Sequence, residues 1–201
     1  MFTALQALLN SLAVTFDLPI LDWIQAHLQC TFLDVTMPIV TLFGDGGVFW
    51  IAVAVVLLLF AKYRKTGFSM GMALILGLLV CNIILKPQVA RIRPYNFQLQ
   101  EYGREITLLV KGLNDYSFPS GHTIASFEAC TVLMLHDKRL GIPATVLAIL
   151  IAFSRLYLYV HYPTDVLVSL VLGILFGFLG NYIVDQIYKK KVYNGKYSLK
   201  E

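Results

Sequence analysis

Apolar residues in this chain gather into long runs that are separated by short polar or glycine-rich breaks. The clearest runs cover residues 48–61, 68–85, 122–135, 143–159 and 163–187. A helix needs about 20 apolar residues to cross the hydrocarbon core of a bilayer, and inside the bilayer it satisfies its own backbone hydrogen bonds. The pattern therefore predicts five membrane-spanning helices, some of them completed by polar residues at their ends.

The first 43 residues carry a weaker pattern. Residues 2–16 are apolar but short, and Asp17 with Pro19 closes them. Residues 20–43 mix apolar and polar positions, so a half-buried helix and a partly inserted one both fit. Glycines at positions 44, 46 and 47 then break the pattern. We expect a sixth, N-terminal helix here, without a fixed placement for residues 1–43.

Composition supports the membrane interpretation. Of 201 residues, 58% are hydrophobic and 14% are charged, and the mean hydropathy is +0.71. A soluble domain carries roughly 25% charged residues. We therefore predict an all-α integral membrane bundle of about six transmembrane helices, formed by residues 1–201 as a single domain. We expect membrane lipids, and no nucleic acid, around it.

Basic residues recur at every second end of the predicted helices. They are Lys62, Arg64, Lys65, Lys138, Arg139 and Lys189–Lys191. Cytoplasmic loops of membrane proteins are enriched in Lys and Arg, so this side is predicted to be cytoplasmic. The non-cytoplasmic ends then carry polar segments that include Lys86, His122 and His161. Cations on that outer side run against the rule, and a bound anion would explain them.

Three cations lie in these outer segments. Lys86 and Arg93 follow one predicted helix, and Arg155 lies near the end of another. A phosphoryl group in transfer is stabilised by positioned positive charge. The planar fork of Arg can grip two oxygens, whereas Lys acts as a mobile point charge. The three could surround one phosphate, although each one alone also fits an interfacial side chain whose charged end reaches water.

Residues 119–122 have the composition of a turn that feeds a helix. Ser120 beside Gly121 near the N-cap leaves backbone N–H groups for an anion, and the helix dipole adds attraction. His161 and Asp165 are four residues apart, so on a helix that begins near Pro163, or just before it, they can meet on one face. The carboxylate can fix the tautomer of His161 and free its other nitrogen as a nucleophile or base. His122 then remains to protonate the leaving oxygen.

Simpler interpretations fit each segment taken alone. A capping turn with a satisfied histidine would explain residues 119–122, and an interfacial pair would explain His161 with Asp165. Arg91 is expected to face lipid headgroups. The cysteines at positions 30, 81 and 130 show no metal-binding spacing, and no acidic and histidine cluster does either. We therefore expect no metal and no other cofactor.

In their order along the chain, the segments resemble the signature of the type 2 phosphatidic acid phosphatase superfamily of membrane lipid phosphatases. Residues 86–94 fit K-x6-R-P, residues 119–122 are P-S-G-H, and residues 154–165 fit S-R-x5-H-x3-D. By motif the resemblance covers residues 86–165, and by helical pattern it extends over about residues 44–187. It implies a six-helix fold and a metal-independent hydrolysis of a phosphomonoester or pyrophosphate through a phosphohistidine.

The resemblance also implies a role for each matched residue. His161 would be the nucleophile, oriented by Asp165, and His122 would be the general acid. The substrate phosphate would be held by Lys86, Arg93, Ser120, Gly121 and Arg155. We expect the charge of Asp165 to favour a protonated imidazole at His161, and the cations to oppose protonation at His122.

These observations favour a lipid phosphatase in a bacterial cell (inner) membrane, with its site facing the periplasm or exterior. Undecaprenyl diphosphate is the first candidate substrate and phosphatidylglycerol phosphate the second. A membrane protein that binds or transports phosphate without hydrolysis stays an alternative, as does a structural membrane protein without catalysis. Soluble vanadium haloperoxidases share the motif pattern, but the hydropathy argues against a peroxidase.

Overall fold

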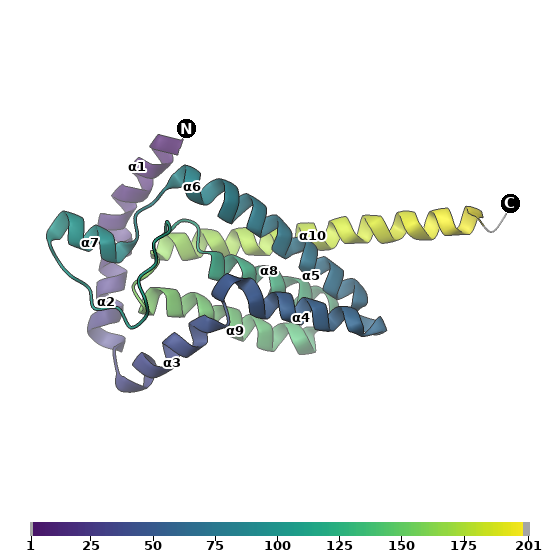
Figure 1. Ribbon diagram of the computed structural model, residues 1–201, viewed down its shortest axis with the longest axis horizontal. Coiled ribbons are helices and arrows are strands. Elements are labelled where there is room, and N and C mark those ends of the chain that lie inside the picture. The colour runs from purple at the N-terminus through teal and green to yellow at the C-terminus, as the bar shows by residue number, and fades with distance from the viewer. Residues whose placement is uncertain (1, 199–201) are drawn as a thin grey trace.

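The computed structural model describes residues 2–198, with side chains for residues 5–190. Within this range the chain forms helices and no strand, which confirms the predicted all-α class. A bundle of five helices runs side by side in these residues (Figure 1). They are α4 (Val48–Leu59), α5 (Arg64–Gly77) with its π-helical continuation η4 (Leu78–Leu85), α8 (Gly121–His136), α9 (Lys138–Tyr157) and α10 (Pro163–Ser198). Each corresponds to one of the predicted apolar runs.

By length and composition, five helical stretches of the described residues could cross a membrane: Leu5–Leu28, Thr31–Leu59, Ala61–Tyr102, Lys138–Tyr157 and Pro163–Lys190. Helix α8 has 16 residues, fewer than the ~20 that a crossing requires. It packs against α5, α9 and α10, so its polar first turn lies in protein. Since Leu5–Leu28 runs across the bundle axis, the described residues give five bundle helices when α8 is counted, close to the expected number of about six.

Basic turns meet at one end of the bundle. The turn from α4 through η3 (Ala61–Tyr63) to α5 contacts the α8–α9 turn, where the Tyr63 hydroxyl lies 3.2 Å from Asp137 Oδ2. Asp137 also caps α9 by accepting a hydrogen bond from the backbone N–H of Arg139. Lys65 forms a 2.6 Å ion pair with Asp185 of α10. The clusters predicted to share one side of the membrane therefore do share one end of the bundle.

Small residues let α10 approach its neighbours closely. A Cβ atom on Gly173 would lie 2.8 Å from the carbonyl oxygen of Ile124, and one on Gly177 would lie 2.7 Å from Thr131. Gly180 meets the backbone of α5 at 2.6 Å. Membrane helices commonly use such spaced small residues, because apolar lipid leaves close packing as the main attraction between helices. These contacts fix the position of the first turn of α10, which carries Asp165.

The N-terminal segment lies across the opposite end of the bundle. Helix α1 (Phe2–Leu12), the π-helical turn η1 (Ala13–Asp17) and α2 (Leu18–Leu28) form one rod, drawn in purple and running across the bundle axis in Figure 1. Leu9 packs with Val89 and Phe118, and Leu21 packs with tyrosines of the α9–α10 connection. Helix α3 (Thr31–Leu42) then returns to the bundle and leads through η2 (Asp45–Gly47) into α4. Residues 5–43 therefore pack against the bundle, a position that the sequence alone did not assign.

The connection between η4 and α8 covers the same end. It contains α6 (Lys86–Val89), α7 (Pro94–Tyr102) and an irregular stretch that leads to Ser120. Tyr95 anchors the irregular stretch, since its hydroxyl hydrogen bonds with the backbone N–H and carbonyl of Leu113. The backbone N–H of Ser117 donates to the carbonyl of Arg91 at 2.9 Å. The long polar segment is therefore an ordered cap over the site and not a free loop.

Candidate active site

The residues predicted for the site meet at the capped end of the bundle. Lys86 follows η4, His122 lies in the first turn of α8, and Arg155 lies in the last turn of α9. His161 lies in the α9–α10 connection, and Asp165 in the first turn of α10. A cavity of about 660 Å³ reaches this point, and its lining includes Lys86, Arg93, Gly121, His122, Arg155 and His161. Ser120 and Asp165 are fully buried beside these residues.

His161 is buried between a cation and a carboxylate. Its Nε2 lies 3.3 Å from Arg93 Nη1, and its Nδ1 lies 3.6 Å from Asp165 Oδ2. A guanidinium can only donate, so the Nε2 atom that faces it is the unprotonated nitrogen. The proton then sits on Nδ1, on the side of the carboxylate. This is the tautomer that leaves Nε2 free to attack, although the distance to Asp165 is slightly longer than a hydrogen bond.

The pKa of His161 is shifted in the direction opposite to the influence expected from Asp165. Burial lowers this pKa well below its ordinary value of 6.5, and the charges of Arg93, Arg155 and Lys86 lower it further. Asp165 does not reverse the effect because its oxygens are engaged elsewhere. Oδ1 accepts from Arg91 at 2.5 Å, and Oδ2 accepts from the backbone N–H of Tyr162 at 3.1 Å. His161 is therefore neutral at neutral pH.

The prediction that Arg91 faces headgroups is wrong. Its side chain is 1% exposed and pairs with Asp165 and, at 2.8 Å, with Asp17 of the N-terminal rod. It also stacks on Tyr162, with 3.7 Å between the guanidinium carbon and the ring centroid. The two carboxylates offset the desolvation cost of burying this cation, since an unpaired buried charge would be strongly destabilising. Arg91 thereby links the carboxylate beside His161 to the N-terminal rod.

His122 has a partner that the sequence did not suggest. Its Nε2 lies 2.6 Å from Asp45 Oδ1, a residue of the glycine-rich break before α4. Since a carboxylate only accepts, Nε2 carries a proton. Gly44 permits the approach, because a Cβ atom there would lie 2.6 Å from the imidazole ring. The glycines in this break were a visible signal, but they gave no indication of what the neighbouring Asp45 would contact.

An acidic side chain from the cap also occupies the cationic cluster. Asp115 forms ion pairs of 2.8 Å with Lys86 and 2.5 Å with Arg93. Burial would raise the pKa of the Asp115 carboxyl, but the hydrogen bonds and charges of Lys86 and Arg93 outweigh it and lower that pKa to about 2. Asp115 is therefore ionised throughout the neutral range. Nothing in its position along the sequence indicated this contact.

Arg155 lines the same cavity as Lys86 and Arg93. Its Nη1 donates to the Thr41 hydroxyl, while its buried Nε finds no partner among the described residues. At the start of α8, the backbone N–H of Ser120 donates to the Ser169 hydroxyl at 2.8 Å. The next N–H groups of a helix have no partner within it and suit an anion. The site therefore offers oxygen-binding donors from α8, α9 and the cap. Among the described residues, no three His, Cys, Asp or Glu side chains are grouped to hold a metal ion.

The family model described as the PAP2 superfamily matches residues 66–189, a range that contains all three motif segments. The chain belongs to this superfamily. It is 36% identical over 131 residues to an undecaprenyl-diphosphatase from Sulfolobus acidocaldarius, covering 65% of this chain and 61% of that protein. It is 33% identical over 155 residues to phosphatidylglycerophosphatase B from Bacillus subtilis, covering 71% of this chain and 64% of that protein. The chain thus spans less than two thirds of the length of these relatives.

Solved structures share the arrangement. A transmembrane PAP2 type phosphatidylglycerolphosphate phosphatase from Bacillus subtilis superimposes with a TM-score of 0.72 at 27% identity, covering 92% of this chain and 93% of that one. Aquifex aeolicus LpxE gives a TM-score of 0.71 at 27% identity, with 83% and 94% covered. A bacterial vanadium-dependent iodoperoxidase gives 0.59 at 19% identity, which shows a common fold alone. The chain therefore shares the fold of a transmembrane PAP2 phosphatase over most of its length.

Proposed function

We propose that this protein is a membrane lipid phosphatase that works without a metal, through a phosphohistidine at His161. One observation carries the proposal: the unprotonated Nε2 of a neutral histidine lies in a cavity wall lined by Lys86, Arg93 and Arg155, with His122 in the same cavity. A nucleophile, a proton donor and three cations together are the parts that phosphoryl transfer needs.

The proposed reaction has two steps. The three cations and the α8 N-terminus hold the phosphate oxygens while Nε2 of His161 attacks phosphorus. The P–N bond forms as the P–O bond to the lipid breaks. In the substrate complex His122 is the imidazolium, stabilised by Asp45 and the phosphate, and it gives one of its two protons to the leaving oxygen and becomes neutral. In the second step His122 takes a proton from water, the hydroxide displaces His161, and inorganic phosphate leaves. Asp165 stabilises the proton on Nδ1 of His161 while positive charge develops on the ring.

The substrate in this proposal is a lipid phosphate or diphosphate. The cavity continues from the cations between apolar helices, so a headgroup at His161 and a tail inside the bundle fit together. Relatives carry the names undecaprenyl-diphosphatase and phosphatidylglycerophosphatase B, which supports both candidate substrates. We place the protein in a bacterial inner membrane, with the site facing the periplasm or exterior, because the basic turns lie at the opposite end.

Binding or transport of phosphate without hydrolysis remains the competing function. Such a protein would use the same cations, but it has no need of the Asp45–His122 pair or of a neutral His161 among three positive charges. Hydrolysis uses both histidines, and this favours the phosphatase.

The test is release of inorganic phosphate from purified lipid phosphates and diphosphates in detergent, with EDTA present. We expect wild-type protein to release phosphate, vanadate to inhibit it, and His161→Ala to be inactive while remaining folded. His27→Ala is a matched control, since His27 lies on the outside of α2 and stacks on Trp23. Tight phosphate binding without release by the wild type would favour the binding protein, and activity in His161→Ala would refute the mechanism.

A further inference from the structure

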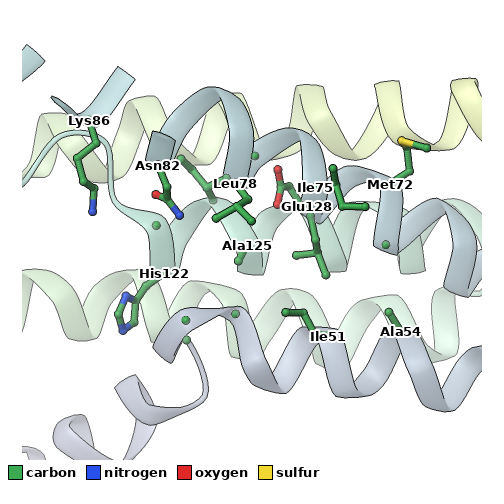
Figure 2. Close-up of a pocket in the computed structure, with 18 of the residues that line it drawn as sticks. Ile51, Ala54, Met72, Ile75, Leu78, Asn82, Lys86, His122, Ala125 and Glu128 are labelled. Carbon is green, nitrogen blue, oxygen red and sulfur yellow. The ribbon is translucent and has the colours of Figure 1, made fainter. Parts of the chain in front are cut away.

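The cavity that begins at the catalytic histidines runs deep into the bundle between α4, α5 and α8. Figure 2 shows Lys86, Asn82 and Glu128 following one another along it, with Ile51 and Ala54 of α4 on the opposite wall. Most of the lining is apolar, as a lipid tail requires. Glu128 and Asn82 are exceptions, and the mechanism proposed above uses neither.

Glu128 is the more unusual of the two. It belongs to the middle of α8, it is 1% exposed, and its Oε1 atom has no hydrogen-bond partner among the described residues. A Cβ atom at position 77 would lie 2.0 Å from that oxygen, so the glycine there makes room for the carboxyl group. Leaving a charge in such surroundings costs far more than leaving a neutral polar group. The site therefore holds the neutral carboxyl, which can donate one hydrogen bond.

Asn82 also has a buried side-chain oxygen, Oδ1, without a partner among the described residues, and it lies nearer to the phosphate site. It comes one helical turn before Lys86. The same side chain faces the start of α8, since a Cβ atom on Gly121 would lie 3.1 Å from Oδ1. Two polar side chains in one apolar cavity, each with an unpartnered atom, indicate that a ligand binds beside them. The neutral carboxyl of Glu128 and the amide N–H of Asn82 are the donors that they offer to such a ligand.

Their depth limits what that ligand can be. Glu128 is six residues after His122 on the same helix, or about 9 Å along the helix axis. The oxygen that reaches Glu128 therefore lies several bonds from the phosphorus atom, near the start of the hydrocarbon chains. Acyl-ester lipids carry carbonyl oxygens at this depth. A polyprenyl chain carries only carbon and hydrogen there.

We infer that the carboxyl proton of Glu128 and the side-chain N–H of Asn82 form a donor subsite for the ester carbonyl oxygens of an acylated glycerol phosphate. This inference rests on the proposed phosphatase function and selects within it: the substrate class is an acyl-ester lipid phosphate in preference to a polyprenyl diphosphate. A site built to hydrogen bond a ligand rejects an analogue that lacks the group, because its buried polar atoms are then left unpaired. The order of the two candidate substrates given by the sequence is thereby reversed.

The experiment compares kcat/KM for three lipids in the same detergent micelles: a diacylglycerol phosphate, the dialkyl ether of the same glycerol phosphate, and a polyprenyl phosphate. The ester and the ether differ only in the carbonyl groups. We expect the wild type to favour the ester over the ether by about tenfold, the effect of one hydrogen bond. Glu128→Met should reduce that ratio to about one, and Glu128→Gln, which keeps an N–H donor, should restore most of it.

Glu101→Met is the matched control, because Glu101 is exposed on α7 and outside the cavity lining. Its ester-to-ether ratio should equal that of the wild type. An equal rate on ester and ether by wild-type protein would overturn the inference, even if the Glu128 variants failed to fold. An unchanged ratio in Glu128→Met would overturn it as well. Hydrolysis of none of the three lipids would instead refute the proposed phosphatase itself.

Discussion

At the scale of single residues, the environment of His161 suits a nucleophile better than a charged base. Burial and three cations keep the imidazole neutral, so it needs no external base to free its lone pair. Asp165 contributes less to this charge balance than its spacing from His161 implied, because Arg91 neutralises it. The position of Asp165 still fixes the side on which the Nδ1 proton sits. Its role is therefore mainly to set the tautomer.

The first prediction concerns pH. Nε2 of His161 must be unprotonated to attack, and the lowered pKa means that this holds well below pH 6.5. We expect the acid limb of kcat/KM to lie below about pH 6.5, and activity to persist at about pH 5.5. Folding stability should be complete above about pH 6.5 and decrease below it, because only the unfolded state then takes up the proton. Measured pH profiles of kcat/KM and of denaturant unfolding test both; an acid limb at or above pH 6.5 would contradict the assignment.

The second prediction concerns Asp115. Its carboxylate occupies Lys86 and Arg93, and with a pKa of about 2 it stays charged at any working pH. An incoming phosphate must displace it. Asp115→Asn should therefore lower the inhibition constant of inorganic phosphate by about tenfold, equivalent to one charge-assisted hydrogen bond.

Glu105→Gln offers a control for Asp115→Asn in the same connecting segment, because Glu105 is exposed. In Glu105→Gln the inhibition constant of inorganic phosphate should equal that of the wild type. Weaker inhibition by phosphate in Asp115→Asn would show that the carboxylate organises the cations and does not compete with the substrate.

At the scale of elements, a buried ion pair joins the N-terminal rod to the candidate active site. Asp17 is fully buried, accepts from Arg91, and also accepts from the backbone N–H and hydroxyl of Thr164 at the start of α10. The rod thus supports the helix turn that carries Asp165. We expect Asp17→Ala to lower the free energy of unfolding by about 3–5 kcal/mol, since it leaves a buried charge short of one partner, and to reduce kcat.

The comparison for that prediction lies in the same rod. Asp22 pairs with Arg104 at 3.0 Å, and both side chains are substantially exposed. Asp22 also accepts from the hydroxyl of the buried Tyr159 at 2.8 Å, so Asp22→Ala should cost about 1–2 kcal/mol, less than Asp17→Ala. Denaturant unfolding in detergent and the rate of phosphate release, measured for Asp17→Ala and Asp22→Ala, test this difference. Equal losses in the two variants would show that Asp17 has no special role.

Sequence patterns predicted the helices of the bundle, but they did not predict which acidic residues contact the site from distant segments. Apolar runs predicted α4, α5, α8, α9 and α10 because lipid exposure forces each crossing to be apolar. The motif residues Lys86, His122 and His161 were placed together because their helices end on one side. Asp17, Asp45 and Asp115 were missed because each reaches the site from a distant segment. Such contacts depend on tertiary packing, which leaves no periodic signal in the sequence.

At the scale of the whole molecule, the proposed orientation puts the capped end outside. Leu99 of α7 is exposed at that end, and Lys62 is exposed at the basic end. After replacement of the exposed Cys30, Leu99→Cys should react with a membrane-impermeant thiol reagent in intact cells, whereas Lys62→Cys should react only after lysis. The buried Cys81 and Cys130 provide the background. The reverse pattern of labelling would place the site in the cytoplasm.

The central claim is that phosphate passes through His161, and trapping the intermediate tests it most directly. Purified protein is mixed with a lipid phosphate labelled with ³²P, quenched within milliseconds in alkaline detergent, which preserves phosphohistidine, and digested for peptide mapping. We predict label on the peptide that contains His161, absent in His161→Ala and retained in His27→Ala. Phosphate release without any labelled protein, or label on another residue, would contradict the account.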